Sequence, residues 1–244
     1  MILNTFKTWV IVLWVILTSS ITSSGQTLKG CGVLINSNGN ILTSTQVIRE
    51  QSDSIVVQLW QGDRYPATII SIDKASGLVL LSITEKQQMC AHLRLKHDKI
   101  IPPKYDECSN VIGYLEGEFD PRGALIGEVN DPNKPAGHFR VRMGSAYNCA
   151  GAPILDESAL LIGIIDKGTT ESDTVQHDEN YMPPPIYGLD ATLILPFLDL
   201  ANVGVTYTNK RDPYKLKHLS NPMDRIEKTV YIGSVFTVLI FDKK

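Results

Sequence analysis

Short apolar runs separated by turn residues fill residues 30–83 of the chain. The runs are CGVLI, ILTS, SIVVQLW, ATIISI and GLVLLSI, and polar clusters such as residues 36–40 (NSNGN) and 61–63 (QGD) lie between them. Strand-length runs at spacings of roughly 8–12 residues, with turn signals between them, are typical of a β-barrel or sandwich. Because no long stretch has helical periodicity, this part of the chain is predicted to be all-β.

A charged stretch at residues 90–105 separates this series from a second one. It contains a Pro-Pro pair, so we interpret it as a linker. The second series of strand candidates is CSNVIGYL, GALIGEV, HFRVRM, APILD, ALLIGIID and YGLDATLIL. Two such series predict two β units, which we assign to residues 26–100 and 101–204.

Two segments of the second unit depart from the strand pattern. Residues 169–185 lack apolar periodicity and end in three consecutive prolines, which predicts a long surface loop. The run PFLDLANVG predicts a short helix that ends near Gly204. The second unit is therefore expected to close with a helix.

Residues 205–244 form a basic tail that ends in a strongly β-prone run, YIGSVFTVLIF. This run is too short to cross a membrane as a helix. Two interpretations remain open. The run is either a strand packed on the body of the protein or an exposed edge that captures a partner strand or promotes self-association.

The amino terminus has the features of a targeting segment. A short start ending in Lys7 is followed by the apolar stretch TWVIVLWVIL and by the small and polar TSSITSSG. Spanning a bilayer takes roughly 20 apolar residues, more than this stretch offers. We therefore predict a signal peptide over residues 1–25, secretion or residence in the secretory pathway lumen, and no stable membrane span after signal removal. The alternative is an uncleaved anchor.

Composition narrows the class of protein. The chain has 244 residues, a formal net charge of -3 and 43% hydrophobic content. These values suit one or two globular domains and exclude a largely disordered chain. A charge balance this close to neutral argues against nucleic acid as a partner.

Four cysteines remain after the predicted signal peptide: Cys31, Cys90, Cys108 and Cys149. In an oxidising compartment an even number suggests disulfides, and four cysteines allow three pairings. No pair has C-x-x-C spacing and no metal-type cluster with histidine is present, so we expect neither a zinc site nor another metal or cofactor.

Three segments, in order, resemble trypsin-like serine proteases of the Do-like (HtrA-type) branch. GCGVLI with NGNILT and QVI (residues 30–48) looks like the family's Gly-rich strand, its turn and the strand that delivers the catalytic histidine. Residues 65–81 resemble the run whose second aspartate orients that histidine, and NCAGAPI with the later LIGI resembles the nucleophile turn and the strand behind it. The softer matches VIG and LILP extend the likeness to roughly residues 30–204.

The resemblance implies a fold and limits what else is carried over. It implies two antiparallel β-barrels of the trypsin-like type, packed side by side with the active cleft between them, and a short C-terminal helix and tail. The Do-like enzymes usually carry a peptide-binding PDZ module after the protease domain. The residues after Gly204 are too few for a complete PDZ module.

The resemblance also locates the catalytic positions, and all three are replaced. Gln46 stands at the histidine position, Gly77 at the aspartate position and Ala150 at the serine position. Glutamine has no pKa near neutrality, glycine has no side chain, and a methyl group cannot attack a carbonyl, so none of the three roles is filled. Asn148 occupies the oxyanion-turn position; asparagine tolerates left-handed backbone better than most residues, which is compatible with the turn persisting.

Two alternatives concern the neighbours of Ala150. A shifted register would make Cys149 the nucleophile of a cysteine-type endopeptidase, and Ser145 offers a serine-type version. Either needs a base, and among the five histidines only His138 falls in the core region of the second barrel. The structural interpretation makes Cys149 a disulfide half: the resemblance places the nucleophile turn near the strand of Cys31, which suggests the pairs Cys31–Cys149 and Cys90–Cys108.

The sequence therefore favours a secreted, non-catalytic serine protease homologue with a binding, scaffolding or regulatory role. Its expected partner is a polypeptide held as an added strand in the vestigial cleft or on a barrel edge. The alternatives are an active serine-type or cysteine-type endopeptidase with a non-standard site and a structural paralogue with no specific ligand. Trp60 is expected in the core or at its rim, and Asp73, which matches the family pattern, is expected to be structural.

Overall fold

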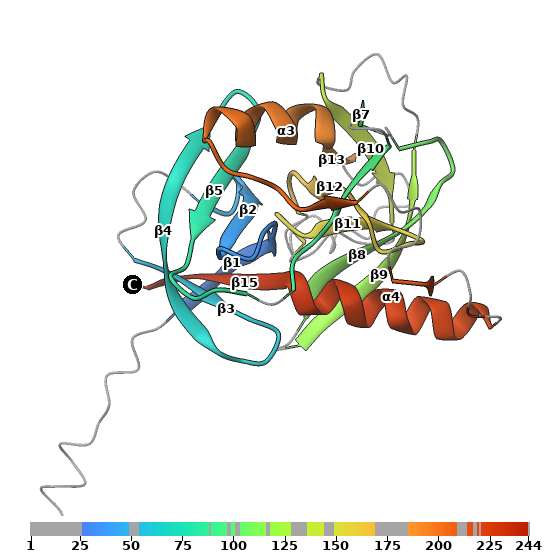
Figure 1. Ribbon diagram of the computed structural model, residues 1–244, viewed down its shortest axis with the longest axis horizontal. Helices are drawn as coiled ribbons and strands as arrows, with labels where there is room; N and C mark the ends of the chain where they lie inside the picture. The colour runs from blue at the N-terminus through green and yellow to red at the C-terminus, as the bar shows by residue number, and fades with distance from the viewer. Residues whose placement is uncertain are drawn as a thin grey trace, which may run out of the picture.

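Two closed, six-stranded antiparallel β-barrels and two helices make up the fold in the computed structural model (Figure 1). The structure describes residues 26–48, 54–87, 89–96, 99–100, 103–115, 118–127, 136–143, 149–168, 185–208, 214–216, 219 and 221–243. The predicted signal peptide and all but one residue of the predicted loop lie outside these ranges. So do Ser145 and Asn148. The expected pair of trypsin-like barrels is confirmed.

The first barrel has the strand order β1-β15-β3-β4-β5-β2. Five of its strands are those predicted from the apolar runs: β1 (Gln26–Leu34), β2 (Asn40–Ser44), β3 (Ile55–Gln58), β4 (Arg64–Asp73) and β5 (Leu78–Ser82). The polar cluster between β1 and β2 forms a turn in which Asn36 Oδ1 accepts hydrogen bonds from the backbone N–H groups of Asn38 (3.1 Å) and Asn40 (3.3 Å). Side-chain capping of this kind explains why asparagines gather there.

The sixth strand of the first barrel comes from the end of the chain. β15 (Thr237–Lys243) pairs with β1 on one side and with β3 on the other, so residues 26–100 do not complete this barrel by themselves. Its side chains alternate in the manner of a strand buried on both faces. Val238 and Ile240 belong to the main buried cluster, whereas Leu239 and Phe241 belong to the cluster of the second barrel.

The β-prone run YIGSVFTVLIF is divided between a helix and this strand. Its first six residues lie in α4 (Pro222–Phe236), and the strand begins only at Thr237. Asn221 caps the helix by accepting from the N–H of Met223 (3.1 Å), and the proline at the first helical turn suits that position. Packing on the body of the protein, one of the two open interpretations of this run, holds for its strand half.

The second barrel follows the order β11-β8-β9-β10-β13-β12, and a β11–β12 pairing closes it. Its strands are β8 (Cys108–Leu115), β9 (Glu118–Ile126), β10 (His138–Arg142), β11 (Pro153–Asp156), β12 (Leu161–Ile165) and β13 (Ile186–Asp190). Three short strands extend the sheet beyond β12: β6 (Leu93–Lys96), β14 (Tyr207–Thr208) and β7 (Lys99–Ile100). The second predicted series is thus a barrel with a small extension.

The predicted linker at residues 90–105 is more structured than its charge suggested. Leu93 is fully buried, and Arg94 is 8% exposed because it forms ion pairs with Glu107 and, at 3.5 Å, with Asp156. Burial of a charged side chain requires such partners. Arg94 therefore joins β6 to the second barrel.

The closing helix begins earlier than predicted. α3 (Ala191–Leu200) starts inside the run YGLDATLIL, which was expected to be a single strand, and it ends before Gly204. Asp190 ends β13 and caps α3, accepting a hydrogen bond from the N–H of Thr192 at 2.7 Å. The cap overrides the β-branched residues that follow it. Pro196 lies within the helix instead of opening it.

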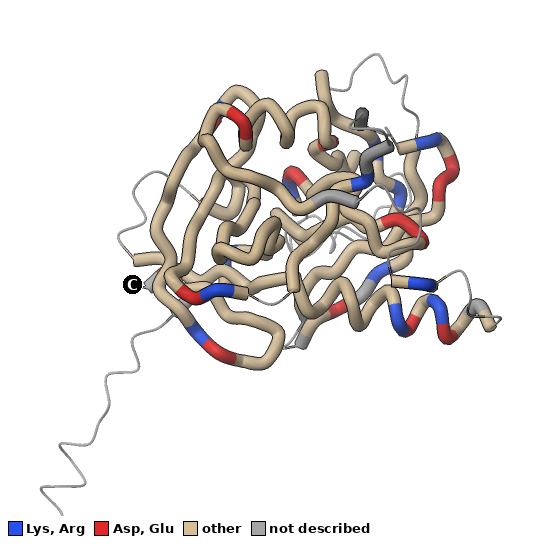
Figure 2. Tube along the Cα trace, in the orientation of Figure 1, with Lys and Arg blue, Asp and Glu red and all other residues tan. Residues whose placement is uncertain are grey.

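Charge is mixed on the described part of the tail. Lys or Arg and Asp or Glu alternate along α4 (Figure 2), where Asp224, Arg225, Glu227 and Lys228 follow one another closely. This helix therefore presents no single-sign surface of the kind that binds nucleic acid. In the part of the chain that the structure describes, no helix is long and apolar enough to cross a membrane.

Candidate functional site

The Gln46 and Gly77 positions lie side by side at one end of the first barrel. Gln46 falls in the turn that follows β2, where its N–H donates to Ser44 Oγ at 3.2 Å and its side chain is exposed. The N–H of the preceding residue, Thr45, donates to the carbonyl of Gly77 at 2.8 Å. The end of β2 and the β4–β5 turn are thus held together by a backbone hydrogen bond.

The turn that carries Ala150 is locked against β1 and β2. The carbonyl of Ala150 accepts from the N–H of Cys31 at 2.8 Å, and the N–H of Gly151 donates to the carbonyl of Ile165 at 2.8 Å. Gly151 has a φ of 73°, and a Cβ there would lie 2.1 Å from the carbonyl oxygen of Cys31 and 2.3 Å from Thr43 Oγ1. Only glycine fits at this position, so the close packing of the turn against β1 and β2 depends on Gly151.

Gly30 joins the two halves of the site. A Cβ at this position would lie 2.7 Å from the carbonyl oxygen of Ala150 and 2.7 Å from Val47 Cγ2. The turn bearing Ala150 and the turn bearing Gln46 therefore meet over the same residue of β1. The structure brings together the three positions that the sequence singled out, where elements of the two barrels meet.

A carboxylate from the second barrel stands beside Gly77. A Cβ on Gly77 would lie 3.5 Å from Asp166 Oδ1, and Ser44 Oγ donates to the backbone carbonyl of Asp166 at 2.7 Å. Asp166 follows β12 directly. Gly77 has a φ of 76°, a left-handed conformation that non-glycine residues rarely adopt. The absence of a side chain at this position therefore fits its backbone conformation, and a Cβ alone would make an ordinary contact with Asp166.

Asp166 also forms a pair with His138 that sequence reasoning missed. His138 Nε2 lies 3.8 Å from Asp166 Oδ2, a separation typical of an ion pair rather than a hydrogen bond, and Nδ1 lies 3.0 Å from the carbonyl of Ala136. The Asp166 carboxylate raises the pKa of His138 above its ordinary value, with a smaller contribution from Asp190. The separation of these residues in the sequence leaves no local pattern that would reveal the pair.

The candidate nucleophile Cys149 is a buried thiol. It is fully buried beside the equally buried Cys31, and burial raises the pKa of Cys149 to about 11. The pKa of Cys31 is raised further, first by its own burial and then by the neighbouring Cys149. Desolvation disfavours the thiolate, which is the reactive form of cysteine.

The predicted disulfides are not formed in the structure. All four cysteines are thiols. The predicted pair Cys90–Cys108 was wrong. Cys90 Sγ lies 3.1 Å from Thr206 Oγ1, whereas Cys108 is exposed at the start of β8. Cys31 and Cys149 are adjacent as expected, but no disulfide joins them.

Two cavities lie away from the Gln46, Gly77 and Ala150 positions. One, of about 590 Å³, lies between α4 and strands β8 and β9 and is lined by Cys108, Leu125 and Ile226 among others. The second, of about 520 Å³, lies between α4 and the first barrel. In the part of the chain that the structure describes, no group of three or more His, Cys, Asp or Glu side chains is placed to hold a metal ion.

Comparison with known proteins agrees with the geometry. Residues 30–164 match the model of the trypsin-like peptidase domain family. A 60-residue segment is 35% identical to a probable periplasmic serine endoprotease DegP-like of Chlamydia pneumoniae; it covers 25% of this chain and 12% of that protein. The chain therefore matches only a small part of that relative's length.

Solved structures with the same fold include three proteases. The first is the HtrA-type protease AlgW with a decapeptide, 17% identical with a TM-score of 0.57 over 71% of this chain and 51% of that one. The Rv3671c protein of M. tuberculosis in an inactive form is 18% identical, with a TM-score of 0.55 over 72% of this chain and 82% of that one. The serine endoprotease from Yersinia pestis is 17% identical, with a TM-score of 0.56 over 70% and 57% of the two chains.

Proposed function

Because this chain belongs to the family of trypsin-like peptidase domains, we propose that it is an exported, non-catalytic member that binds an extended polypeptide without cutting it. One observation supports the proposal above the others. Gln46, Gly77 and Ala150 lie on neighbouring turns that meet through Thr45 and Gly30, and their side chains supply no base, no carboxylate and no nucleophile. A serine protease needs all three groups for acyl transfer.

The nearest replacement nucleophile is disfavoured by its surroundings. With a pKa of about 11, only about one Cys149 in ten thousand is a thiolate at neutral pH. The side chain is fully buried and therefore closed to a substrate carbonyl. A cysteine-type endopeptidase based on Cys149 would have to unfold this turn, which the close packing of Gly151 against β1 opposes.

The His138–Asp166 pair does not rebuild the lost base. Asp166 lies beside Gly77 and is held there by Ser44, and the pair has no nucleophile to activate because Ala150 ends in a methyl group. A general base must reach the nucleophile's proton at about 2.6–3.2 Å or through one water. Both residues belong to the second barrel, so we assign the pair to positioning the Asp166 side chain where that barrel meets Gly77 and Ser44 of the first.

Strand addition is the binding mode that the described backbone supports. Residues 118–124 of β9 pair with β8 on one edge, whereas among the described strands β10 reaches β9 only at Leu125 and Ile126. Gly123 has open space around it. An extended polypeptide could pair with this edge of the second barrel and gain backbone hydrogen bonds without entering a cleaving site.

Export is the compartment that the sequence and one relative favour together. The DegP-like relative is described as periplasmic. The apolar stretch near the amino terminus of this chain is short for a bilayer span, as in a signal peptide. We propose that the folded chain functions outside the cytoplasm.

A peptide library incubated with the full chain tests both parts of this proposal. We expect mass spectrometry to find every peptide intact, while a subset is retained by the immobilised protein. Hydrogen exchange on the retained complex should show added protection at residues 118–124 of β9, because strand addition pairs their edge. Cleavage at a reproducible site would refute the loss of catalysis, and retention without protection of β9 would refute the binding mode.

The alternative of an active endopeptidase now rests on Ser145, since Cys149 is buried. Substitution of Ser145 by alanine separates the two cases. Suppose that this substitution abolishes a cleavage while circular dichroism shows that the fold is intact. That result would favour a serine-type enzyme with a non-standard site. We expect the parent chain to cleave no peptide, so that this substitution changes nothing in the digest.

A further inference from the structure

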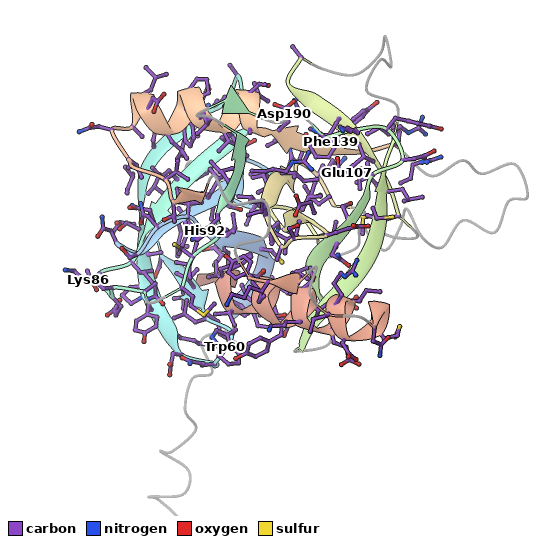
Figure 3. All side chains as sticks on the ribbon, turned by 45° about the vertical axis from the view of Figure 1, so that its right-hand side comes forward. Trp60, Lys86, His92, Glu107, Phe139 and Asp190 are labelled. Carbon is purple, nitrogen blue, oxygen red and sulfur yellow. The ribbon has the colours of Figure 1, made fainter. Side chains whose placement is uncertain are left out.

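The cavity of about 520 Å³ between α4 and the first barrel has an aromatic lining and one acidic residue. Trp60 comes from the turn after β3, Tyr65 from β4 and Tyr231 from α4, and Glu85 lies in the segment that follows β5. Figure 3 shows Trp60 next to α4 at the lower edge of the first barrel. Three parts of the chain that are distant in sequence therefore build one pocket.

The aromatic side chains of this pocket are more exposed than core residues. Trp60 and Tyr231 meet edge to face, with ring centroids 5.9 Å apart and planes inclined by 79°. Trp60 is 37% exposed, Tyr231 57% and Met89, also in the lining, 40%. Trp60, which was expected in the core or at its rim, is exposed and belongs to neither buried cluster. Exposed aromatic faces attract cations through the negative potential of the ring face.

Glu85 brings a hydrogen-bond acceptor that no described residue satisfies. Its Oε2 atom is buried, yet no donor of the described residues reaches it. The backbone around it is held in place: the N–H of Ile83 donates to Gly39 at 3.0 Å, and the N–H of Gln87 donates to Ser37 at 2.9 Å. A buried carboxylate oxygen is unfavourable without a donor, and Glu85 is one of the residues that line this pocket.

We propose that this pocket binds a primary or secondary ammonium group carried on an apolar stem. The ammonium N–H donates to Glu85 Oε2, the positive charge lies against Trp60 and Tyr231, and the stem packs on Leu59 and the other apolar lining. The pocket is many times larger than an ammonium group alone, since a water molecule takes about 30 Å³ in the liquid. The ligand must therefore bring an apolar body.

The aromatic rings and the Glu85 acceptor together define the class of ligand. A quaternary ammonium satisfies the aromatic rings but has no N–H for Glu85, and an alcohol has a donor but no charge for the rings. A protonated alkylamine satisfies both. Lys86, exposed in the same lining, disfavours a second positive charge at the entrance.

Tryptophan fluorescence of the full chain carrying Trp9→Phe and Trp14→Phe tests the proposal, because Trp60 is then the only tryptophan. We expect hexylammonium to give a saturable change, with hexanol and hexyltrimethylammonium each binding at least about tenfold more weakly. Calorimetry on variants should show hexylammonium binding about tenfold weaker for Glu85→Gln and for Tyr231→Ala, and not weaker for the control Lys86→Gln.

Three results would overturn the proposal. Hexanol binding as well as hexylammonium would make the pocket a purely apolar cavity. Hexyltrimethylammonium binding as well as hexylammonium would remove any role for the Glu85 acceptor, as would an unchanged affinity in Glu85→Gln. The absence of saturable hexylammonium binding would refute the site altogether. Should a variant fail to fold, the comparison of the three ligands on the parent chain decides the matter.

Discussion

Replacement of Ile240 by alanine should destabilise the protein more than most single substitutions, because β15 completes the first barrel. Ile240 is fully buried in the barrel interior, opposite Gly30 of β1 and Val57 of β3. Its Cδ1 would lie only 3.1 Å from a Cβ at Gly32, so the side chain fills the space that this glycine leaves. Loss of the side chain would therefore open a cavity between three strands.

The expected size of the effect follows from the atoms removed. Isoleucine to alanine deletes three buried carbons, and at about 0.8 kcal/mol for each the transfer contribution is about 2.4 kcal/mol. A cavity term of about 24 cal/mol per Å³ adds on the order of 1–2 kcal/mol if the surrounding strands relax only in part. The free energy of unfolding should fall by about 3–4 kcal/mol.

Urea unfolding followed by circular dichroism measures this loss. The matched control is Ile70→Ala in β4 of the same barrel, where the isoleucine is 43% exposed and the change should stay within about 0.5 kcal/mol. A loss below about 1 kcal/mol for Ile240→Ala, or equal losses for the two variants, would contradict the placement of the chain end inside the first barrel.

Further predictions concern the region around Ala150. Gly151→Ala should lower the free energy of unfolding, measured in urea, by more than about 2 kcal/mol, because its Cβ would overlap the carbonyl of Cys31. This loss is near the upper end of the cost of a strained backbone position. Iodoacetamide should label Cys149 in the native protein only slowly at neutral pH, and rapid labelling would refute its burial and its pKa of about 11. The pKa of His138 is raised in the folded state, so its contribution to stability should be present below about pH 6.5 and lost as the pH rises through the raised value. Asp166→Asn should remove that pH dependence from the urea midpoint, and an unchanged profile would show that the pair does not couple to folding.

Local patterning was sufficient for most strands. Alternation and turn residues located β1 to β5 and β8 to β12, because strands bounded by polar turns are encoded in neighbouring residues. The same signals failed where a helix and a strand share one apolar run. Periodicity over a few residues cannot separate them, so the end of α4 and β15 were read as one strand, and the first half of α3 was hidden in the run that begins with β13.

Non-local features of the site could not be inferred from the sequence. The convergence of Gln46, Gly77 and Ala150 was expected from a family resemblance rather than from local pattern. The position of Asp166 against Gly77 depends on how the second barrel docks on the first, which no short segment encodes. The entry of β15 between β1 and β3 likewise depends on pairing across nearly the whole chain.

Restoring the three catalytic residues examines how far the scaffold has departed from an enzyme. We expect Gln46→His, Gly77→Asp and Ala150→Ser together to recover little or no activity in a peptide-library digest. An aspartate at position 77 would have to adopt a φ near 76°, and it would face the carboxylate of Asp166, 3.5 Å from its Cβ.

Labelling of the unmodified chain with a fluorophosphonate probe tests the central claim most directly. The probe reacts with an activated serine and needs no knowledge of the substrate. The absence of a base and a nucleophile at Gln46 and Ala150 predicts that mass spectrometry will find no labelled residue above a heat-denatured control. Stoichiometric labelling of any single serine in the native chain, lost on denaturation, would contradict the account.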